Sequence, residues 1–267
     1  MNILFIGDVC GKPGRRILKS SLSSLIKKTK AEVVIVNGEN AAHGKGITPK
    51  IYQEFIRLGV HCVTLGNHAF AKSEIKQEID CLDRLIRPEN MTPSDLGKSS
   101  IQLMTSEGIL RILNISGEAF MDNITESPFD TMKQYINRDE MLFVDFHGET
   151  TGEKLTFFHT YKMNCVGIVG THTHVTTSDE TVDLGCGYIS DVGMTGVIHS
   201  ILGRDINEVI RRQNGEKTHY TVATGEAMLN AVLLTVVNRR CEHIERIKVI
   251  ENQKQDLEYI VFSERLI

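Results

Sequence analysis

The sequence predicts an α/β fold in which polar residues gather where the strands end. Short apolar runs recur along the chain, and each stops abruptly at a polar turn that contains glycine. Between the early runs lie segments whose apolar residues recur at helical spacing, with lysines on the opposite face. This strand–helix–strand alternation indicates a largely parallel sheet that is covered by helices on both faces.

The predicted elements follow one another closely along the chain. Buried strands are expected at residues 2–6, 33–36, 62–65, 141–144, 166–169 and 188–189. Helices are expected around residues 17–26 and 51–58, where the apolar side chains fall on one face. The last part of the chain has a different pattern: residues 218–223, 227–237 and 244–250 are typical of antiparallel strands and hairpins.

The middle of the chain is mixed in character. Residues 71–140 combine a helical pattern, a proline-containing stretch and a hairpin around Gly108. No internal repeat, low-complexity tract or linker interrupts the sequence. We therefore predict a single domain over residues 1–267, and we interpret residues 71–140 as a cap-like elaboration of it.

Composition and charge narrow the class of protein. The chain is 41% hydrophobic and 24% charged, which is ordinary for a soluble globular protein, and its net charge of -4 leaves an association with RNA unsupported. The first apolar run is soon interrupted by Asp8, so no signal peptide is expected, and no stretch has the length of a membrane helix. Scattered cysteines without a CxxC pair favour a cytoplasmic protein with reduced thiols.

The polar residues at the strand ends form a chemically coherent set. They are Asp8, Glu39, Asn40, Asn67, His68, His147, His172 and His174. Each alone has an ordinary explanation, because an Asp after a strand commonly caps a helix and an Asn in a glycine-rich turn is common turn chemistry. Sites in open α/β sheets form at the carboxyl ends of the strands, so the complete set predicts a metal centre.

The histidine pair His172-Thr173-His174 is the most informative motif of this set. Residues i and i+2 of an extended segment point the same way, so the two imidazoles are expected to converge on neighbouring ions. The run NGENAAHGKG at residues 37–46 adds a carboxylate and an amide in a glycine-rich loop directly after a strand. Together these motifs bring ligands from distant parts of the chain to one place.

The ligand types indicate which metals fit and how many. Carboxylate, imidazole and amide ligands suit Mn, Fe, Zn or Co better than Ca, and they are too many for one four-coordinate ion. Two ions about 3.5–4 Å apart, bridged by a carboxylate and a hydroxide, would use them all. Such a pair generates hydroxide near neutral pH and neutralises phosphoryl charge, so the set predicts phosphoester hydrolysis.

These residues resemble the calcineurin-like metallophosphoesterase superfamily. GNH at residues 66–68 and GTHTHV at residues 170–175 are the most specific pieces, and the resemblance covers most of the chain. Two motifs depart from the common pattern: Asp8-Val9-Cys10 lacks the usual histidine, and a glutamate stands in NGEN where the bridging aspartate is usual. With GDVCGKPGRR, DFHGE and DVGMTG, these departures match the YmdB-type bacterial phosphodiesterase branch.

The resemblance implies a fold and a role for each residue. The fold would be a four-layer α/β/β/α metallophosphoesterase sandwich with two mixed sheets and the site at one edge between them. One ion would be held by Asp8, Glu39, Asn40 and His174. The other would be held by Glu39, Asn67, His147 and His172. His68 would act as general acid, and the loop with Met194, Thr195 and Gly196 would border the substrate.

The resemblance also implies the reaction. A metal-bridging hydroxide would open 2′,3′-cyclic nucleotides, and the general acid would protonate the departing 2′-oxygen to leave 3′-nucleotides. The ions would be iron, with manganese as a substitute, and the protein would be a homo-oligomer. Asp145 or Glu149 would orient an imidazole, while the thiol of Cys10, which stands where a ligand is usual, is interpreted as a spectator.

Three alternatives remain open on the sequence. The first is a phosphomonoesterase or an RNA-processing phosphoesterase with the same centre. The second is a metal-dependent amidohydrolase, although there the His-x-His pair follows the first barrel strand, while here it comes late. The third is a non-catalytic regulatory protein that keeps the metal centre as a binding platform, against which an intact His68 argues.

Overall fold

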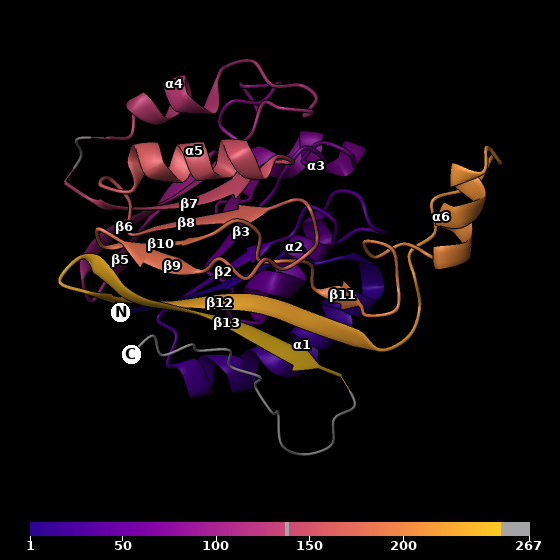
Figure 1. Cartoon of the computed structure of the whole chain (residues 1–267), viewed down its shortest axis with the longest axis horizontal. Coiled ribbons are helices and arrows are strands. Elements are labelled where there is room, and N and C mark those ends of the chain that lie inside the picture. Colours follow the sequence, from indigo (N-terminus) through magenta and orange to yellow (C-terminus); the bar gives the residue numbers. More distant parts are fainter. Residues whose placement is uncertain (137–138, 252–267) are drawn as a thin grey trace.

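Two mixed β-sheets packed face to face form the centre of the molecule (Figure 1). The computed structural model describes residues 1–136 and 139–251. Within these ranges the first sheet has the order β11–β12–β1–β2–β3–β4, and β13 lies along the other edge of β12. Its strands are β1 (Asn2–Ile6), β2 (Val33–Asn37), β3 (Cys62–Thr64), β4 (Leu85–Ile86), β11 (Gly196–Val197), β12 (Ala227–Val237) and β13 (Arg240–Ile250).

The second sheet has a parallel centre and antiparallel edges. Its order is β5–β6–β7–β8–β10–β9, and the pairs from β6 to β10 are parallel. Its strands are β5 (Ser100–Thr105), β6 (Gly108–Ser116), β7 (Met141–His147), β8 (Gly167–Thr171), β9 (Thr181–Asp183) and β10 (Cys186–Ile189). The pairing of β5 with β6 is the hairpin that the sequence predicts around Gly108.

Helices cover the outer faces of the two sheets. Helices α1 (Gly11–Thr29), α2 (Pro49–Arg57) and α3 (Ser73–Glu78), with the 3₁₀ turn η1 (Ile79–Cys81), pack on the first sheet. Helices α4 (Pro128–Lys133) and α5 (Thr151–Tyr161) pack on the second sheet. The last helix, α6 (Ile206–Gln213), stands apart from both sheets (Figure 1).

The alternation of side chains along each strand explains the four layers. In β1, Leu4 and Ile6 pack against the helices, while Ile3 and Phe5 pack between the sheets. In β7, Phe143 packs between the sheets and its neighbours pack under α5. Because both faces are buried, the strands are continuous apolar runs. The four-layer α/β/β/α sandwich is confirmed. In the part of the chain that the structure describes, neither sheet has helices on both faces: each has helices on one face and the other sheet on its second face.

Two expectations for the later parts of the chain have different outcomes. The C-terminal hairpin is confirmed, because β12 pairs with β13 over almost its full length. Residues 218–223 are not a strand; Val222 makes only an isolated bridge with Arg204. Residues 71–140 contain β4 of the first sheet and β5 and β6 of the second. The single domain and its cap-like elaboration stay predictions.

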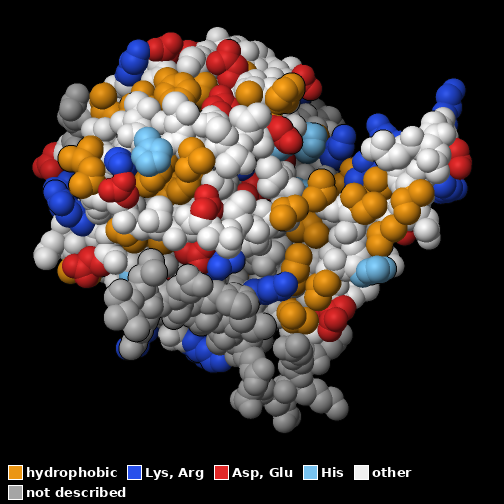
Figure 2. Space-filling model, viewed as in Figure 1, with side chains coloured by type: hydrophobic (Ala, Val, Ile, Leu, Met, Phe, Trp, Pro, Cys, Tyr) orange, Lys and Arg blue, Asp and Glu red, His pale blue; other side chains and the backbone are white. Residues whose placement is uncertain are grey.

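The surface near α6 is apolar. Figure 2 shows hydrophobic side chains gathered where the segment that carries α6 leaves the body of the molecule. Ile198, Leu202 and Ile210 of this segment are 38%, 47% and 48% exposed. Across the described residues, no helix has both the length and the apolar character that crossing a membrane requires.

The carboxyl ends of the parallel strands from the two sheets meet at one edge. Asn37, the last residue of β2, donates a side-chain hydrogen bond of 3.0 Å to Asp145 of β7. Thr64, the last residue of β3, donates to the same carboxylate. These bonds cross from one sheet to the other, so the loops that follow β1, β2, β3, β7 and β8 open onto a shared space.

Candidate metal centre

The structure brings all of the predicted ligand residues to this shared edge. Asp8 follows β1, Glu39 and Asn40 follow β2, and Asn67 and His68 follow β3. His147 ends β7, and the His172-Thr173-His174 turn follows β8. Asp8 and His147 are fully buried and Glu39 is 1% exposed, so the charged groups lie away from solvent.

One group of donor atoms surrounds the imidazole of His147. Its Nε2 atom lies 3.1 Å from Oε1 of Glu39, 3.2 Å from Oδ1 of Asn67 and 3.1 Å from Nδ1 of His172. Ligand atoms bound to one ion at about 2.0–2.2 Å lie at similar distances from one another. The carboxylate of Glu39 and the rings of His147 and His172 are therefore spaced as ligands of a single cation, and they form a potential metal-binding group.

A second group of donor atoms lies beside the first. Nε2 of His174 is 3.2 Å from Oδ1 of Asn40 and 3.9 Å from Oδ1 of Asp8. That carboxylate oxygen of Asp8 is buried and has no hydrogen-bond partner among the described residues. A buried acceptor left without a partner costs about 1–3 kcal/mol, and a cation would satisfy it. The residues present therefore fit a second ion.

The His147 nitrogen that faces away from the donor group is held by a chain of two hydrogen bonds. Its Nδ1 atom lies 2.8 Å from Oγ1 of Thr171, which in turn donates a hydrogen bond of 2.7 Å to Asp145. Because the hydroxyl proton goes to the carboxylate, Thr171 accepts the Nδ1 proton of His147. The lone pair of the neutral ring is then on Nε2, which is the atom that faces Glu39 and Asn67.

The other two rings are fixed in the same way. Nε2 of His172 lies 2.9 Å from the carboxylate of Glu149, which leaves Nδ1 toward the donor group. Nδ1 of His174 lies 3.1 Å from the carbonyl oxygen of Leu202, which leaves Nε2 toward Asn40. The sequence suggests that either Asp145 or Glu149 orients an imidazole. In the structure Glu149 contacts His172 directly, and Asp145 is linked to His147 through the hydroxyl of Thr171.

The pKa values within the cluster describe where its positive charge lies. Burial alone would raise the pKa of the Glu39 carboxyl, but the neighbouring His147 lowers it to about 2. Burial alone would lower the pKa of His147, but Glu39 and the other carboxylates around it raise it to about 9. Burial and the charge of His147 lower the pKa of His172 to about 3. Among these three groups, the proton present at neutral pH is therefore on His147, in the place that a cation would fill.

The His172-Thr173-His174 turn is not extended, which corrects the sequence-based expectation. His172 has φ 100° and His174 has φ 67°, in the left-handed region that residues other than glycine rarely adopt. The two imidazoles converge because the backbone turns at both residues. Strain of this kind costs about 1–3 kcal/mol per residue and persists only where the surroundings hold the backbone.

A buried ion pair holds this turn from beneath. The ammonium of Lys154 in α5 lies 2.9 Å from Asp191 and donates a second bond of 2.9 Å to the carbonyl of Thr171. The same oxygen of Asp191 accepts a bond of 3.0 Å from the backbone N–H of Thr173, between the two histidines. Lys154 and Asp191 are 2% and 1% exposed, so water does not compete for these bonds.

Gly66 of the GNH motif lets the backbone approach the donor group. A Cβ atom at this position would lie 2.2 Å from both Oε2 of Glu39 and Nε2 of His147. No carbon atom fits at that distance, so a side chain here would have to displace the buried side chains of Glu39 and His147. The glycine is therefore required by the cluster itself.

His68 lies at the opening of the cluster. Its backbone N–H donates a bond of 3.1 Å to Glu39, and burial lowers the pKa of its imidazole. Its side chain lines a pocket of about 300 Å³ that Glu39, Asn40, His172 and His174 also line. The structure thus places a titratable ring and members of both groups of donor atoms around one cavity.

Other predicted site residues lie elsewhere. Thr195 is buried and donates its backbone N–H to the carbonyl of Asp8, so it supports the ligand loop. Met194 lines a neighbouring pocket of about 370 Å³, and Gly196 begins β11. Burial and Asp8 raise the pKa of Cys10 to about 12, so it is a neutral thiol. Substrate contact by the loop that contains Met194 and Gly196 stays a prediction.

Sequence reasoning did not find three residues that also line the 300 Å³ pocket. They are Lys45, Arg204 and Tyr220. Lys45 belongs to the NGENAAHGKG loop, in which the carboxylate and the amide are the features that attract attention. Arg204 and Tyr220 lie between β11 and β12. Tyr220 falls in the run 218–223 that the sequence predicts as a strand of a hairpin, and nothing in that pattern points to a site.

The geometry agrees with what comparison with known proteins finds. Residues 4–247 match the family model described as YmdB-like protein. The chain belongs to the YmdB-like family. The 2′,3′-cyclic-nucleotide 2′-phosphodiesterase of Bacillus subtilis (strain 168) is 38% identical over 257 residues, which are 93% of this chain and 97% of that protein.

Two solved structures that match this chain over nearly their full length have the same fold. A novel phosphatase from Mycoplasma pneumoniae superposes with a TM-score of 0.89 at 35% identity, over 96% of this chain and 97% of that one. A hypothetical protein from Thermus thermophilus superposes with a TM-score of 0.88 at 33% identity, over 94% of this chain and 100% of that one. The YmdB-like fold, with its two open sheets, also excludes the barrel that the amidohydrolase alternative requires.

The substitution Gly66→Ala is expected to abolish metal binding while the protein still folds, because the added methyl group displaces Glu39 and His147. Calorimetric titration with Mn²⁺ measures the binding, and circular dichroism checks the fold. Gly152→Ala in α5 is the matched control, since a Cβ atom there meets nothing within 4 Å. Equal Mn²⁺ affinity in the two variants would contradict the proposal that Glu39 and His147 bind the ion beside Gly66.

Metal binding is expected to release about one proton at pH 7.5, because His147, with its pKa of about 9, must lose its proton to become a ligand. Glu39 and His172, with pKa values of about 2 and 3, have none to lose. Titration with Mn²⁺ in buffers of different ionisation enthalpy measures the release. Affinity should rise with pH and level off near 9; a pH-independent affinity would show that His147 is no ligand.

Proposed function

We propose that this protein is a metal-dependent phosphodiesterase that opens 2′,3′-cyclic nucleotides to 3′-nucleotides. One observation carries the proposal: His68 lines the same pocket as Glu39, Asn40, His172 and His174, which belong to two adjoining groups of donor atoms that are spaced as metal ligands. The name of the Bacillus subtilis relative supports the substrate, and the match extends over nearly the whole of both chains. The enzyme is a phosphoric ester hydrolase, as its named relatives are.

In this proposal the buried donors hold two divalent ions. One would be held by Asp8, Glu39, Asn40 and His174. The other would be held by Glu39, Asn67, His147 and His172. When bound, such ions supply an activated water nucleophile and neutralise charge on the phosphoryl oxygens. Glu39 would contribute to both, because its carboxylate lies 3.1 Å from His147 and the next residue, Asn40, lies beside His174.

His68 supplies the proton that the leaving group needs. His68 lines the pocket and is not in the donor group of Glu39, His147 and His172, so its ring would be free to contact an oxygen of a phosphodiester bound there. In the opening of a 2′,3′-cyclic phosphate, the bond from phosphorus to the 2′-oxygen breaks while the 3′-oxygen keeps its phosphorus. His68 would donate its proton to that 2′-oxygen and so prevent an unstabilised alkoxide.

A second candidate function is phosphomonoester hydrolysis. The Mycoplasma pneumoniae structure, at 35% identity, is described as a phosphatase, and the same donors would bind a terminal phosphate. Iron as the native metal and assembly into a homo-oligomer belong to the proposal too. Elemental analysis and light scattering of the purified protein check them, and exposed Ile198, Leu202 and Ile210 offer an apolar surface for association.

The reaction is tested with the purified protein in the presence of Mn²⁺. We expect 2′,3′-cyclic AMP to be converted to 3′-AMP, with hydrolysis of p-nitrophenyl phosphate far slower, and Glu39→Gln to abolish turnover. Chromatography separates 3′-AMP from 2′-AMP. Formation of 2′-AMP would show that the 3′-oxygen is the leaving group, which contradicts the proposed protonation of the 2′-oxygen. Preference for the monoester would favour the second candidate function.

The role of His68 is tested by the nature of the leaving group. In His68→Asn the kcat for 2′,3′-cyclic AMP is expected to fall about 10²–10⁴-fold, because the 2′-oxygen leaves poorly without a proton. The kcat for bis(p-nitrophenyl) phosphate should fall far less, because p-nitrophenolate leaves as a stable anion. Equal losses for the two substrates would show that His68 positions the cluster and does not act as the acid.

A further inference from the structure

The metal pocket has a cationic wall that the proposed reaction does not use. Lys45 comes from the loop after β2, and Arg204 and Tyr220 come from residues 198–226, the segment that carries α6 (Figure 1). All three line the same pocket of about 300 Å³ as Glu39 and His68. Two segments that are far apart along the chain thus place two positive groups beside the cluster.

Arg204 is held in one orientation before any ligand arrives. Its Nε and Nη2 atoms donate to both carboxylate oxygens of Glu208, at 2.7–3.1 Å, and Glu208 also accepts a bond of 2.6 Å from Thr218. Its Cζ atom lies 4.6 Å from the centre of the Tyr220 ring. These contacts fix the guanidinium plane, and they leave its Nη1 atom without a protein partner among the described residues.

Tyr220 connects this segment to the ligand loop. Its hydroxyl lies 3.4 Å from the carbonyl oxygen of Gly44, and a Cβ atom at Gly44 would lie only 2.5 Å from that hydroxyl oxygen. Gly44 has φ +82°, so the position suits glycine for its conformation as well as for its space. The ring therefore rests directly on the backbone of NGENAAHGKG, one residue before Lys45.

Lys45 adds the second charge. Its ammonium lies 5.7 Å from the centre of the same Tyr220 ring, and no carboxylate pairs with it among the described residues. Two cations over one aromatic ring repel one another, and an anion between them relieves that repulsion. Arg204 Nη1 and the Lys45 ammonium are both unsatisfied donors of the kind that bind phosphate.

We infer that Lys45 and Arg204 form a second phosphate subsite, and that the preferred substrate carries a phosphate on the 5′ side of its 2′,3′-cyclic phosphate. The inference rests on the proposed function. The donor atoms of the cluster take the cyclic phosphate, and the cationic wall, which contributes nothing to that cluster, takes the additional anion. Two molecules have this chemistry: a 5′-phosphorylated nucleoside 2′,3′-cyclic phosphate, and an RNA fragment that ends in a cyclic phosphate.

The subsite is tested by comparing two substrates that differ by one phosphate. For the wild-type protein, kcat/KM for 5′-phosphoadenosine 2′,3′-cyclic phosphate is expected to exceed that for 2′,3′-cyclic AMP by about tenfold, mainly through KM, since hydrogen bonds between charged groups have this strength. In Arg204→Ala and Lys45→Ala the ratio should fall toward one. An equal loss for both substrates would overturn the inference, because it would assign the two cations to the cyclic phosphate.

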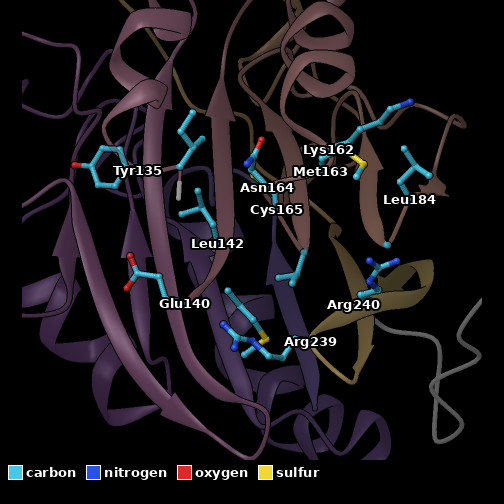
Figure 3. A pocket seen from close by; sticks show the side chains of 14 residues that line it. Tyr135, Glu140, Leu142, Lys162, Met163, Asn164, Cys165, Leu184, Arg239 and Arg240 are labelled. Atoms are coloured by element: carbon cyan, nitrogen blue, oxygen red, sulfur yellow. The ribbon is translucent and has the colours of Figure 1, made fainter. Parts of the chain in front are cut away.

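Arg240→Ala is the matched control for loss of an exposed arginine. Arg240 lines a different pocket, of about 280 Å³, together with Cys165 and Leu184 (Figure 3). That pocket lies at the amino-terminal ends of β7 and β8, at the opposite edge of the sheet from the metal ligands. The substrate ratio should stay at its wild-type value in this variant, and a reduced ratio would show a general effect of surface charge.

Product binding gives a second measurement that does not depend on turnover. In calorimetric titrations with Mn²⁺ present, adenosine 3′,5′-bisphosphate is expected to bind more tightly than 3′-AMP, by about tenfold in the wild type and less in Arg204→Ala. A dinucleotide that ends in a cyclic phosphate separates the two sources: it should match the 5′-phosphorylated nucleotide if RNA ends are accepted. Absence of any turnover in the wild type would refute the proposed function, whereas turnover without a substrate preference would refute only the subsite.

Discussion

Lone pairs that converge in a buried space are the constraint on which the rest of this structure depends. Nε2 of His147 lies within 3.2 Å of donor atoms from Glu39, Asn67 and His172, and the neighbouring carboxylates raise the pKa of His147 to about 9. Such an arrangement is stable only when a proton or a metal ion lies among them. The cluster therefore needs a positive charge at its centre, from a proton or from a metal ion.

The surrounding structure serves to keep these atoms together in spite of their repulsion. Gly66 has no side chain, so the backbone can close over the donors. Thr171 and Asp145 fix one ring, and the Lys154–Asp191 pair holds the strained turn that carries the other two. A buried ion pair adds little to overall stability, but here its geometry fixes the backbone N–H of Thr173 and so the direction of its neighbours.

Much of this was predictable from the sequence, for identifiable reasons. The buried strands are short apolar runs, and the ligands follow them because parallel strands end at a common edge. The residue pattern alone does not separate one sheet from two, since a strand buried on both faces has the same composition in either case. The turn at His172 was not predicted, because the enrichment of histidine among residues of positive φ is too weak to mark one particular position. Arg204 and Tyr220 escape sequence reasoning because only tertiary packing brings them to the pocket.

The division of labour between segments has a consequence for how such a protein changes over evolutionary time. The donor atoms belong to strand ends that are locked into the core, whereas Arg204 and Tyr220 belong to residues 198–226, which join the first sheet only at β11 and β12. Under the proposed subsite, replacement of this segment would alter what is recognised, and it would leave the donor atoms in place as long as a backbone carbonyl still holds Nδ1 of His174 as that of Leu202 does. Substrate selectivity could therefore diverge between lineages through changes in residues 198–226 while the donor residues stay the same, provided that the residue that replaces Tyr220 still fits over Gly44.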